Sequence, residues 1–372
     1  MRVQITNGMF MVLIVNMIYA KAIGVTQSMM VGEAGSAIWL STSFATLQGL
    51  AIMFVTVLAA RHAPRRDVMD QASHLLGSWA GKLLGIVFFV FFLGAYGGFM
   101  VTFVYHLMDY FLPDTPTYIF ILAALIVGLF GAYHGIEVMG RMAYVGIAAI
   151  IALNILIMIG SVFDLDIRNI MPLFEEGVLR TVLASRHSDT DWAVATMMAA
   201  IILPTVKRPD RWASSGCAGI LFGWVFTVIW PILESGVLSA AVVQQYFVAC
   251  MQLARSAHLG YFIQRYEMIM VAFFSISSLI QIMMGLFCAA HSLSKTFGLK
   301  DYRPMLIPAG LALGASGYWT VADHMRAHSL MHEVWPWVAL PIAFAMPFLM
   351  WGLNVVFKKK GTSGHSSVGS AN

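Results

Sequence analysis

Charged residues are scarce in this chain. Only 11% of its 372 residues are Asp, Glu, Lys or Arg, whereas 59% are hydrophobic. Soluble domains carry roughly 25% charged residues, so this composition excludes an ordinary water-soluble domain. The mean hydropathy of +0.79 agrees with that exclusion. The composition therefore predicts an all-α protein that crosses a membrane several times.

Cysteine is scarce too, and the motifs of several enzyme classes are missing. Cys217, Cys250 and Cys288 are odd in number and have no spacing typical of a metal site, so we expect buried thiols, with a redox role as the alternative. The chain contains no nucleophile elbow, zinc-protease motif, P-loop or haem-attachment pattern. We therefore predict that it is not an enzyme and uses no cofactor.

What the chain has in abundance is long apolar runs, and their hydropathy predicts about ten membrane spans. No cleavage site closes the first run, so we expect it to be retained as the first span. The predicted spans are 6–27, 36–60, 82–111, 116–135, 139–162, 187–205, 214–242, 262–295, 304–320 and 334–357. They form one membrane domain, residues 1–358, and the polar tail, residues 359–372, is expected to be a disordered cytoplasmic segment.

The basic residues test this topology. With the N-terminus in the cytoplasm, 15 of the 22 Lys and Arg residues fall on the cytoplasmic side and six on the outer side. This bias predicts that both termini are cytoplasmic. The positive charges are scattered over loops and termini and form no patch, so no nucleic-acid partner is predicted.

The remaining basic residue, Lys21, stands within the first span, in the stretch AKAIG at 20–24. A cation near the centre of a span costs at least ~2.5–3.5 kcal/mol on insertion scales, so it usually faces a cavity or a counter-charge. The small neighbours favour a local opening of the helix. Lys21 is either a snorkelling cation or structural ion pair, or it binds a carboxylate or replaces a coupling cation. Glu234 in the seventh span is the candidate counter-charge.

The sixth span is also irregular. It begins with polar residues, and its apolar part, 193–203, would cover only about 16 Å as a helix at 1.5 Å per residue, which is too short to cross alone. The preceding segment, 163–186, is expected to form a short surface helix. The first and sixth spans are equivalent in a five-plus-five arrangement, so the two interruptions indicate an inverted-repeat transporter fold with a midplane site. Opened helix ends there would suit the carboxylate and ammonium of a zwitterion.

Seven blocks of sequence connect the chain to a known family. They are ITNGMF (5–10), EAGSAIWLS (33–41), HGIEVMGRMAYV (134–145), NIMPLFEEG (169–177), GYFIQRYEMIMVAFF (260–274), FGLKDYRPMLIP (297–308) and EVWPWVALPIAFAMPFL (333–349). In this order, the blocks resemble those of the B-subunit permeases of spore nutrient-germinant receptors, a branch of the amino acid–polyamine–organocation superfamily. The resemblance covers about residues 5–358.

This resemblance implies a leucine-transporter-like fold with broken first and sixth spans, in the inner membrane of a bacterial spore. It also implies A-type and C-type partner subunits and a small nutrient ligand, such as an amino acid. The chain departs from the family at three positions: Lys21 stands in place of a frequent Thr, Ala195 in place of Glu, and Gln281 in place of Lys. Ligand identity is therefore not carried over.

In such a fold, the ligand lies between the first and sixth spans and is walled by the third and eighth. The matching positions are Ala20, Lys21, Ala22, Ile23, Gly24, Tyr96, Gly97, Gly98, Val101, Met197, Met198, Ala199, Ala200, Phe274, Ser275, Ser277, Ser278 and Gln281. The alternative for the glycines is that they merely allow close helix packing.

Histidines recur near the end of the chain. His324, His328 and His332 follow one another at intervals of four residues, which would place three imidazoles on one helical face and could hold a metal. The alternative, a solvated amphipathic loop helix, leads us to predict no metal site. His106 and Asp109, near the end of the third span, are expected at the membrane interface.

The resemblance, together with the predicted midplane site, thus implies a germinant-receptor subunit that binds a small nutrient in the membrane core and signals through its partners. The alternative is a secondary amino-acid transporter coupled to proton or sodium, because one fold can serve both functions. No acid is evident beside the expected pocket, which favours the receptor.

Overall fold

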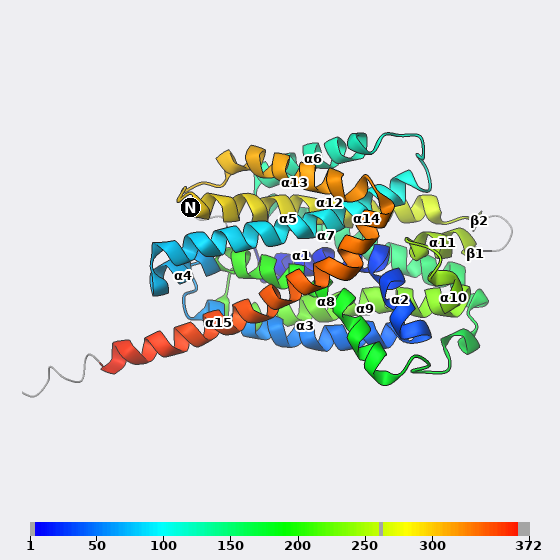
Figure 1. Ribbon diagram of the computed structural model, residues 1–372, viewed down its shortest axis with the longest axis horizontal. Coiled ribbons are helices and arrows are strands. Elements are labelled where there is room, and N and C mark those ends of the chain that lie inside the picture. Colours follow the sequence, from blue (N-terminus) through cyan, green and yellow to red (C-terminus); the bar gives the residue numbers. More distant parts are fainter. Residues whose placement is uncertain (1–3, 260–262, 364–372) are drawn as a thin grey trace, which may run out of the picture.

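Long helices lie side by side along the long axis of the molecule (Figure 1). The computed structural model describes residues 4–259 and 263–363. The long helices are α1 (Asn7–Lys21), α3 (Ile38–Arg61), α5 (Ser78–Met108), α6 (Thr117–His134), α7 (Ile136–Ser161), α8 (Val178–Ile202), α9 (Trp212–Leu233), α12 (Glu267–Thr296), α13 (Leu306–Val321) and α15 (Trp335–Ser363). The chain enters the bundle at the end where α15 leaves it (Figure 1), as expected for an even number of crossings.

Shorter elements connect these helices. The short α-helices are α2 (Gln27–Ala34), α4 (Val68–Leu76), α10 (Ala240–Val243), α11 (Ala249–Ser256) and α14 (His324–Ser329). Among the described residues, the three π-helical turns are η1 (Ala22–Thr26), η7 (Glu234–Leu238) and η9 (Leu330–Val334). The 3-10 turns there are η2 (Gly35–Ala37), η3 (Val162–Asp164), η4 (Ile167–Ile170), η5 (Leu203–Thr205), η6 (Pro209–Arg211) and η8 (Arg303–Met305). Two short strands, β1 (His258–Leu259) and β2 (Ile263–Gln264), pair antiparallel.

Seven stretches among the described residues are long and apolar enough to cross a membrane. One of them, Asn7–Arg61, contains both the first and the second predicted span. α8 is too polar to qualify and α13, at 16 residues, is too short. The membrane protein is therefore multi-pass, and the count of ten spans stays a prediction.

The outer surface of the bundle is apolar. Ile126 and Phe130 on α6 are each 68% exposed, and Leu311 on α13 is 69% exposed. When neighbouring helices expose apolar side chains to this extent, they form a hydrophobic surface whose contact with water is unfavourable. A bilayer would cover them, in agreement with the multi-pass assignment.

The first predicted span contains a widened turn and no opening. α1 passes directly into η1, and α2 continues the helix to Ala34, beyond the predicted end at residue 27. The expected opening around 20–24 is therefore wrong in form, although the irregularity lies at that place. A π turn keeps its backbone groups bonded within the helix while adding one residue to the turn.

The sixth predicted span is not broken. α8 runs without interruption for 25 residues, about 37 Å at 1.5 Å per residue, and includes the last nine residues of the expected surface segment 163–186. The polar residues 185–191 lie in its middle and, except for Arg186, are buried. The prediction failed because a hydropathy profile cannot distinguish a polar helix face packed against other helices from a helix end in water.

The tail prediction is only partly covered by the described residues. α15 continues to Ser363, five residues into the segment expected to be disordered. Residues 364–372 lie outside the described residues, so their disorder stays a prediction.

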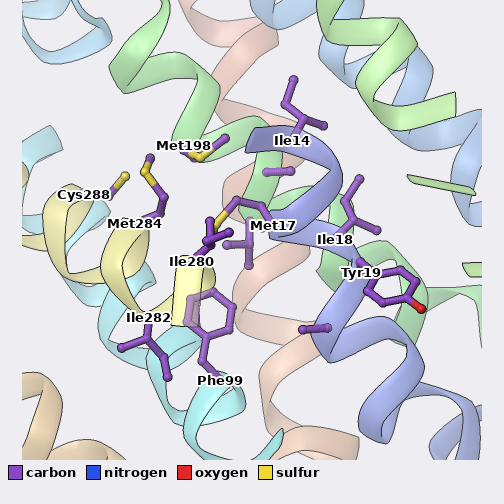
Figure 2. Packing of buried hydrophobic residues seen from close by; sticks show 14 of the residues in the cluster. Ile14, Met17, Ile18, Tyr19, Phe99, Met198, Ile280, Ile282, Met284 and Cys288 are labelled. Atoms are coloured by element: carbon purple, nitrogen blue, oxygen red, sulfur yellow. The ribbon is translucent and has the colours of Figure 1, made fainter. Parts of the chain in front are cut away.

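α1 is the centre of the core. Residues 12–27 are all buried, which is typical of a helix surrounded on every side. α1 packs against α7, α8, α9 and α12. Figure 2 shows its apolar side chains, among them Met17 and Tyr19, within this core. The irregular turn η1 therefore continues a helix that is enclosed on every side.

Candidate ligand site around Lys21

Lys21 is held in the core by three side-chain oxygens. Its Nζ lies 2.7 Å from Oδ1 of Asp191, 3.1 Å from Oγ1 of Thr26 and 3.1 Å from Oγ1 of Thr190. The side chains of Lys21 and Asp191 are only 4% and 1% exposed. An ammonium has three donors, and here each has an acceptor. The snorkelling alternative for Lys21 is therefore excluded.

The π turn η1 brings Thr26 within hydrogen-bond distance of Lys21. Thr26 follows Lys21 by five residues, a spacing that an α-helix places on different faces and a π turn brings into register. Its hydroxyl accepts from Lys21 Nζ and lies 3.0 Å from Oδ2 of Asp191 and 3.2 Å from the Lys21 carbonyl, so it donates to one of these oxygens. The irregular backbone thus links α1 to α8 through a charged cluster.

The predicted pairing of Lys21 with Glu234 is wrong. Lys21 pairs with Asp191 instead, and neither carboxylate oxygen of Glu234 has a hydrogen-bond partner among the described residues. Glu234 lies at the start of η7, beyond the end of α9, and is fully buried. Charge type alone indicates Glu234 as the partner, whereas Asp191 belongs to the polar segment that begins the sixth predicted span.

A second buried acid, Asp189, lies near Asp191 on α8. Its Oδ1 accepts a hydrogen bond of 2.9 Å from Trp192 Nε1, and its Oδ2 accepts bonds of 3.3 Å from Ser185 and Gln48. All these donors are neutral. Both acids were missed as site residues, and the segment SDTDW, with two acids in a predicted span, was the signal that pointed to them. The expectation that no acid lies beside the pocket is therefore wrong.

Two predicted glycines let α5 approach this cluster. A Cβ on Gly98 would lie 3.3 Å from Cε of Lys21, and a Cβ on Gly24 would lie 2.6 Å from Cγ2 of Thr102. Gly98 therefore gives room to the stem of Lys21, and Gly24 lets η1 lie against α5. At these two glycines, the close packing of α5 against α1 and η1 is also what forms the wall of the site.

The end of α5 is buried at this point. The ring of His106 stacks on Phe274 of α12 at 4.1 Å between centroids, and its Nε2 lies 3.3 Å from Sγ of Cys250. His106 is fully buried within the protein, whereas Asp109 pairs with His324 at the partly exposed helix end, and their position relative to the membrane interface stays a prediction. Cys250 and Cys288 are buried thiols as expected, and Cys217 is only partly buried.

The eighth-span residues contact α1 one turn before Lys21. Gln281 Nε2 donates to the carbonyl of Met17 at 2.8 Å, and Ser277 Oγ donates to that of Asn16 at 3.3 Å. Oε1 of Gln281 and Oγ of Ser278 are buried without partners in the described part of the chain. Ser275, by contrast, is partly exposed.

The remaining predicted residues divide between this site and other places. Ala20, Ala22, Ile23 and Val101 are buried in the core around α1 and α5. The ring of Tyr96 lies near Gly285 and Gly317, and Gly97 faces Thr320 of α13. Met197 and Ala200 line a cavity of about 20 Å³ that also borders α3 and α15. Met198 is part of the core shown in Figure 2. Lys21, Gly24 and Gly98 are therefore the predicted residues that lie at the charged cluster, and Phe274 lies against His106 beside Gly24.

The three spaced histidines do not form one set. His324 pairs with Asp109 and stacks on Tyr105 at 4.1 Å. α14 ends at Ser329, and the π turn η9 changes the helical register before His332. The spacing of four residues therefore does not place all three imidazoles on one face.

Comparison with known proteins decides the family. A family model described as spore germination protein matches residues 4–317. This chain belongs to the spore germination protein family. Spore germination protein YndE of Bacillus subtilis (strain 168) is a similar member, 23% identical over 266 residues, which cover 70% of this chain and 72% of YndE. The predicted family is confirmed.

Solved transporter structures share the fold of this spore germination protein. The closed conformation of Mhp1, a nucleobase-cation-symport-1 family transporter with bromovinylhydantoin bound, superposes with a TM-score of 0.67 at 12% identity, covering 95% of this chain and 90% of Mhp1. MhsT in complex with L-phenylalanine gives a TM-score of 0.63 at 15% identity, covering 93% and 94% of the two chains. The leucine-transporter-like fold is confirmed, and the protein is a membrane transporter or receptor, not an enzyme.

Proposed function

We propose that this spore germination protein is the nutrient-binding membrane subunit of a germinant receptor. It would lie in the spore inner membrane with both termini in the cytoplasm and would signal through A-type and C-type partner subunits. Membership of the family supports the role in germination, and the transporter-like fold supports a small-molecule ligand. An amino acid is the ligand class that suits the charges in the core.

One observation carries this proposal: the buried pair of Lys21 and Asp191 at η1. A zwitterionic amino acid carries one charge of each sign, so its carboxylate would share Lys21 and its ammonium would share Asp191. The ligand would exchange one internal ion pair for two charge-assisted contacts, which are roughly twice as strong as neutral hydrogen bonds. The unused acceptor of Gln281 and hydroxyl of Ser278 would supply neutral contacts.

This arrangement also provides a signal. Lys21 and Asp191 belong to α1 and α8, so a ligand that enters between them changes how the first and sixth spans contact one another. A ligand shifts an equilibrium between conformations only by its difference in affinity for them. Partner subunits that contact these helices would respond to the changed ratio of the two conformations.

A thermal-shift screen of amino acids and sugars on the purified protein tests the proposal. At least one amino acid should raise the melting temperature of the wild type, because a ligand that binds only the folded state stabilises it by mass action. The variant Lys21→Thr should lose that shift, whereas Glu234→Gln should retain it. An equal shift in wild type and Lys21→Thr would contradict binding at this site.

A secondary amino-acid transporter coupled to proton or sodium is the second candidate. Asp191 favours it, because this buried acid within the cluster is the kind of group that carries a coupled proton. Lys21, with three oxygen partners, also occupies the place that a coordinated cation would take. Robust uptake of the labelled amino acid by the protein alone in liposomes would favour the transporter, and binding without uptake would favour the receptor.

A further inference from the structure

A second cluster of polar side chains lies apart from the Lys21 cluster. Glu33 on α2, His187 on α8 and His332 in η9 bring one ligand atom each to within 4.8 Å of one another, a grouping found among the described residues. The three residues are separated along the chain by more than 140 positions, so folding alone brings them together. The helices α2 and α14, the second of which η9 continues, lie on the half of the bundle away from the C-terminal end of α15 (Figure 1).

The distances in this cluster suit a metal better than hydrogen bonds. Nε2 of His187 and Nε2 of His332 each lie 3.4 Å from the same oxygen, Oε1 of Glu33. N–H···O hydrogen bonds are usually about 2.7–3.2 Å long. A tetrahedral Zn²⁺ with ligands at about 2.0–2.1 Å holds neighbouring ligand atoms about 3.4 Å apart. The two nitrogen–oxygen distances therefore already match an edge of such a tetrahedron, and all three ligand atoms lie within 4.8 Å of one another.

The environment also fits a bound ion. The rings of His187 and His332 stack at 4.6 Å between centroids and present their nitrogens to one carboxylate. The His187 side chain is 1% exposed, whereas those of Glu33 and His332 are 24% and 26% exposed, so an ion can enter from solvent on one side. Arg186 donates to both oxygens of Glu33 and orients the carboxylate, as hydrogen-bond donors around metal ligands commonly do.

We propose that Glu33, His187 and His332 form a binding site for a divalent transition metal, with Zn²⁺ as its best match. Two imidazoles and one carboxylate form a donor set that Zn²⁺ takes with a fourth position left open. The ion would join α2, which continues the helix of the first predicted span, α8, which contains most of the sixth, and η9, which leads into the tenth. Its binding would hold these three spans together, independently of whether a nutrient binds at Lys21.

Zinc titration of the full-length protein, purified without a histidine tag and treated with a chelator, tests this proposal. Calorimetry should detect one Zn²⁺ per chain, and His332→Gln, His187→Gln and Glu33→Gln should each weaken binding by at least about tenfold. Co²⁺ in place of Zn²⁺ should give the visible absorption of a tetrahedral complex in the wild type and not in His332→Gln.

His324→Gln is the matched control, because His324 lies on the neighbouring helix α14, is more exposed and faces another acid, Asp109. This variant should bind Zn²⁺ as the wild type does. His332→Gln is the decisive variant, because replacing Glu33 also removes its ion pair with Arg186. Wild-type binding retained in folded His332→Gln, or no binding to the wild type at about 100 µM Zn²⁺, would overturn the proposal.

Discussion

Two of the three π-helical turns in the described part of the chain, η1 and η7, each lie at a buried ionisable side chain, Lys21 and Glu234 respectively. At η1, the extra residue brings Thr26 into register with Lys21, and Asp191 completes the cluster. At η7, the carbonyl of Gly236 accepts from Asp166 and Asn169 of the neighbouring loop, while Glu234 has no partner among the described residues. The same backbone irregularity therefore serves a charged cluster in one place and loop attachment in the other.

This difference indicates which of the two buried side chains must keep its charge for the fold to be stable. An uncompensated buried charge is costly, so Glu234 is best tolerated as a neutral carboxylic acid, whereas Lys21 and Asp191 tolerate each other as ions. Removing one partner at η1 should therefore have a large effect, and neutralising the acid at η7 a small one.

Breaking the pair at η1 should give the largest effect. Lys21→Met or Asp191→Asn alone leaves the other charge buried without its partner and should lower the free energy of unfolding by about 3–5 kcal/mol. The double variant removes both charges and should be more stable than either single variant. Thermal unfolding of the purified proteins in detergent measures this coupling. Destabilisations that simply add in the double variant would show that the two residues do not act as a pair.

Crowding η1 should have the next largest effect. Gly24→Ala places a Cβ 2.6 Å from Thr102 and 3.0 Å from His106, and this overpacking should cost about 1–3 kcal/mol. Gly352→Ala on α15 is the matched control, because its Cβ meets nothing within 4 Å. A helical Gly→Ala change in open space should instead stabilise by up to about 1 kcal/mol. Equal melting temperatures for the two variants would argue against a tight contact between η1 and α5.

Asp67 offers a paired acid outside the membrane spans for comparison. Burial raises its pKa, but the hydrogen bond and charge of His291 and the charge of Lys295 outweigh burial, and the pKa falls from 3.8 to about 2. A lowered pKa stabilises the fold above pH 3.8, and this stability is lost as the pH falls through about 2.

Asp67→Asn should therefore lower stability at neutral pH by about 1–2 kcal/mol and weaken the loss of stability between pH 4 and 2. Asn retains the helix cap that Asp67 provides to Asp70, so the change isolates the charge. Melting temperatures measured across this pH range give the comparison. An unchanged pH profile in the variant would mean that the ion pairs of Asp67 do not contribute.

Neutralising the acid at η7 should have the smallest effect. Glu234→Gln has nearly the shape of a neutral Glu, so stability should change by less than about 1 kcal/mol. The same thermal unfolding assay serves here. A loss as large as that of Asp191→Asn would mean that Glu234 is charged and paired in the folded protein, and the contrast between the two turns would fail.

Much of this architecture could be predicted from the sequence. The apolar runs predicted the positions of most of the long helices. The scarcity of charge around Lys21 identified it as an unusual residue. Its partner could not be predicted, because Asp191 lies 170 residues away and only the packing of α1 against α8 joins them. The continuity of α8 could not be predicted either, because it also depends on tertiary packing. Its polar face is buried against neighbouring helices, whereas a hydropathy value depends only on the residue type.

The π turns could not be predicted from the sequence either. The small residues at 20–24 indicated an irregular helix, but not that it would stay closed and bring Thr26 to Lys21. Likewise, the regular spacing of His324, His328 and His332 suggested one face, whereas η9 turns His332 toward Glu33 and His187. Both outcomes depend on one inserted residue per turn.

Ligand affinity in two variants tests the central claim, that a nutrient binds at the Lys21–Asp191 pair. The probe is the amino acid that gives the largest thermal shift with the wild type, and calorimetry measures its affinity for Lys21→Met/Asp191→Asn and for Glu234→Gln. The double variant should fold yet lose at least about tenfold in affinity, since two charge-assisted contacts are absent, whereas Glu234→Gln should bind as the wild type does. Wild-type affinity in the double variant would contradict the claim.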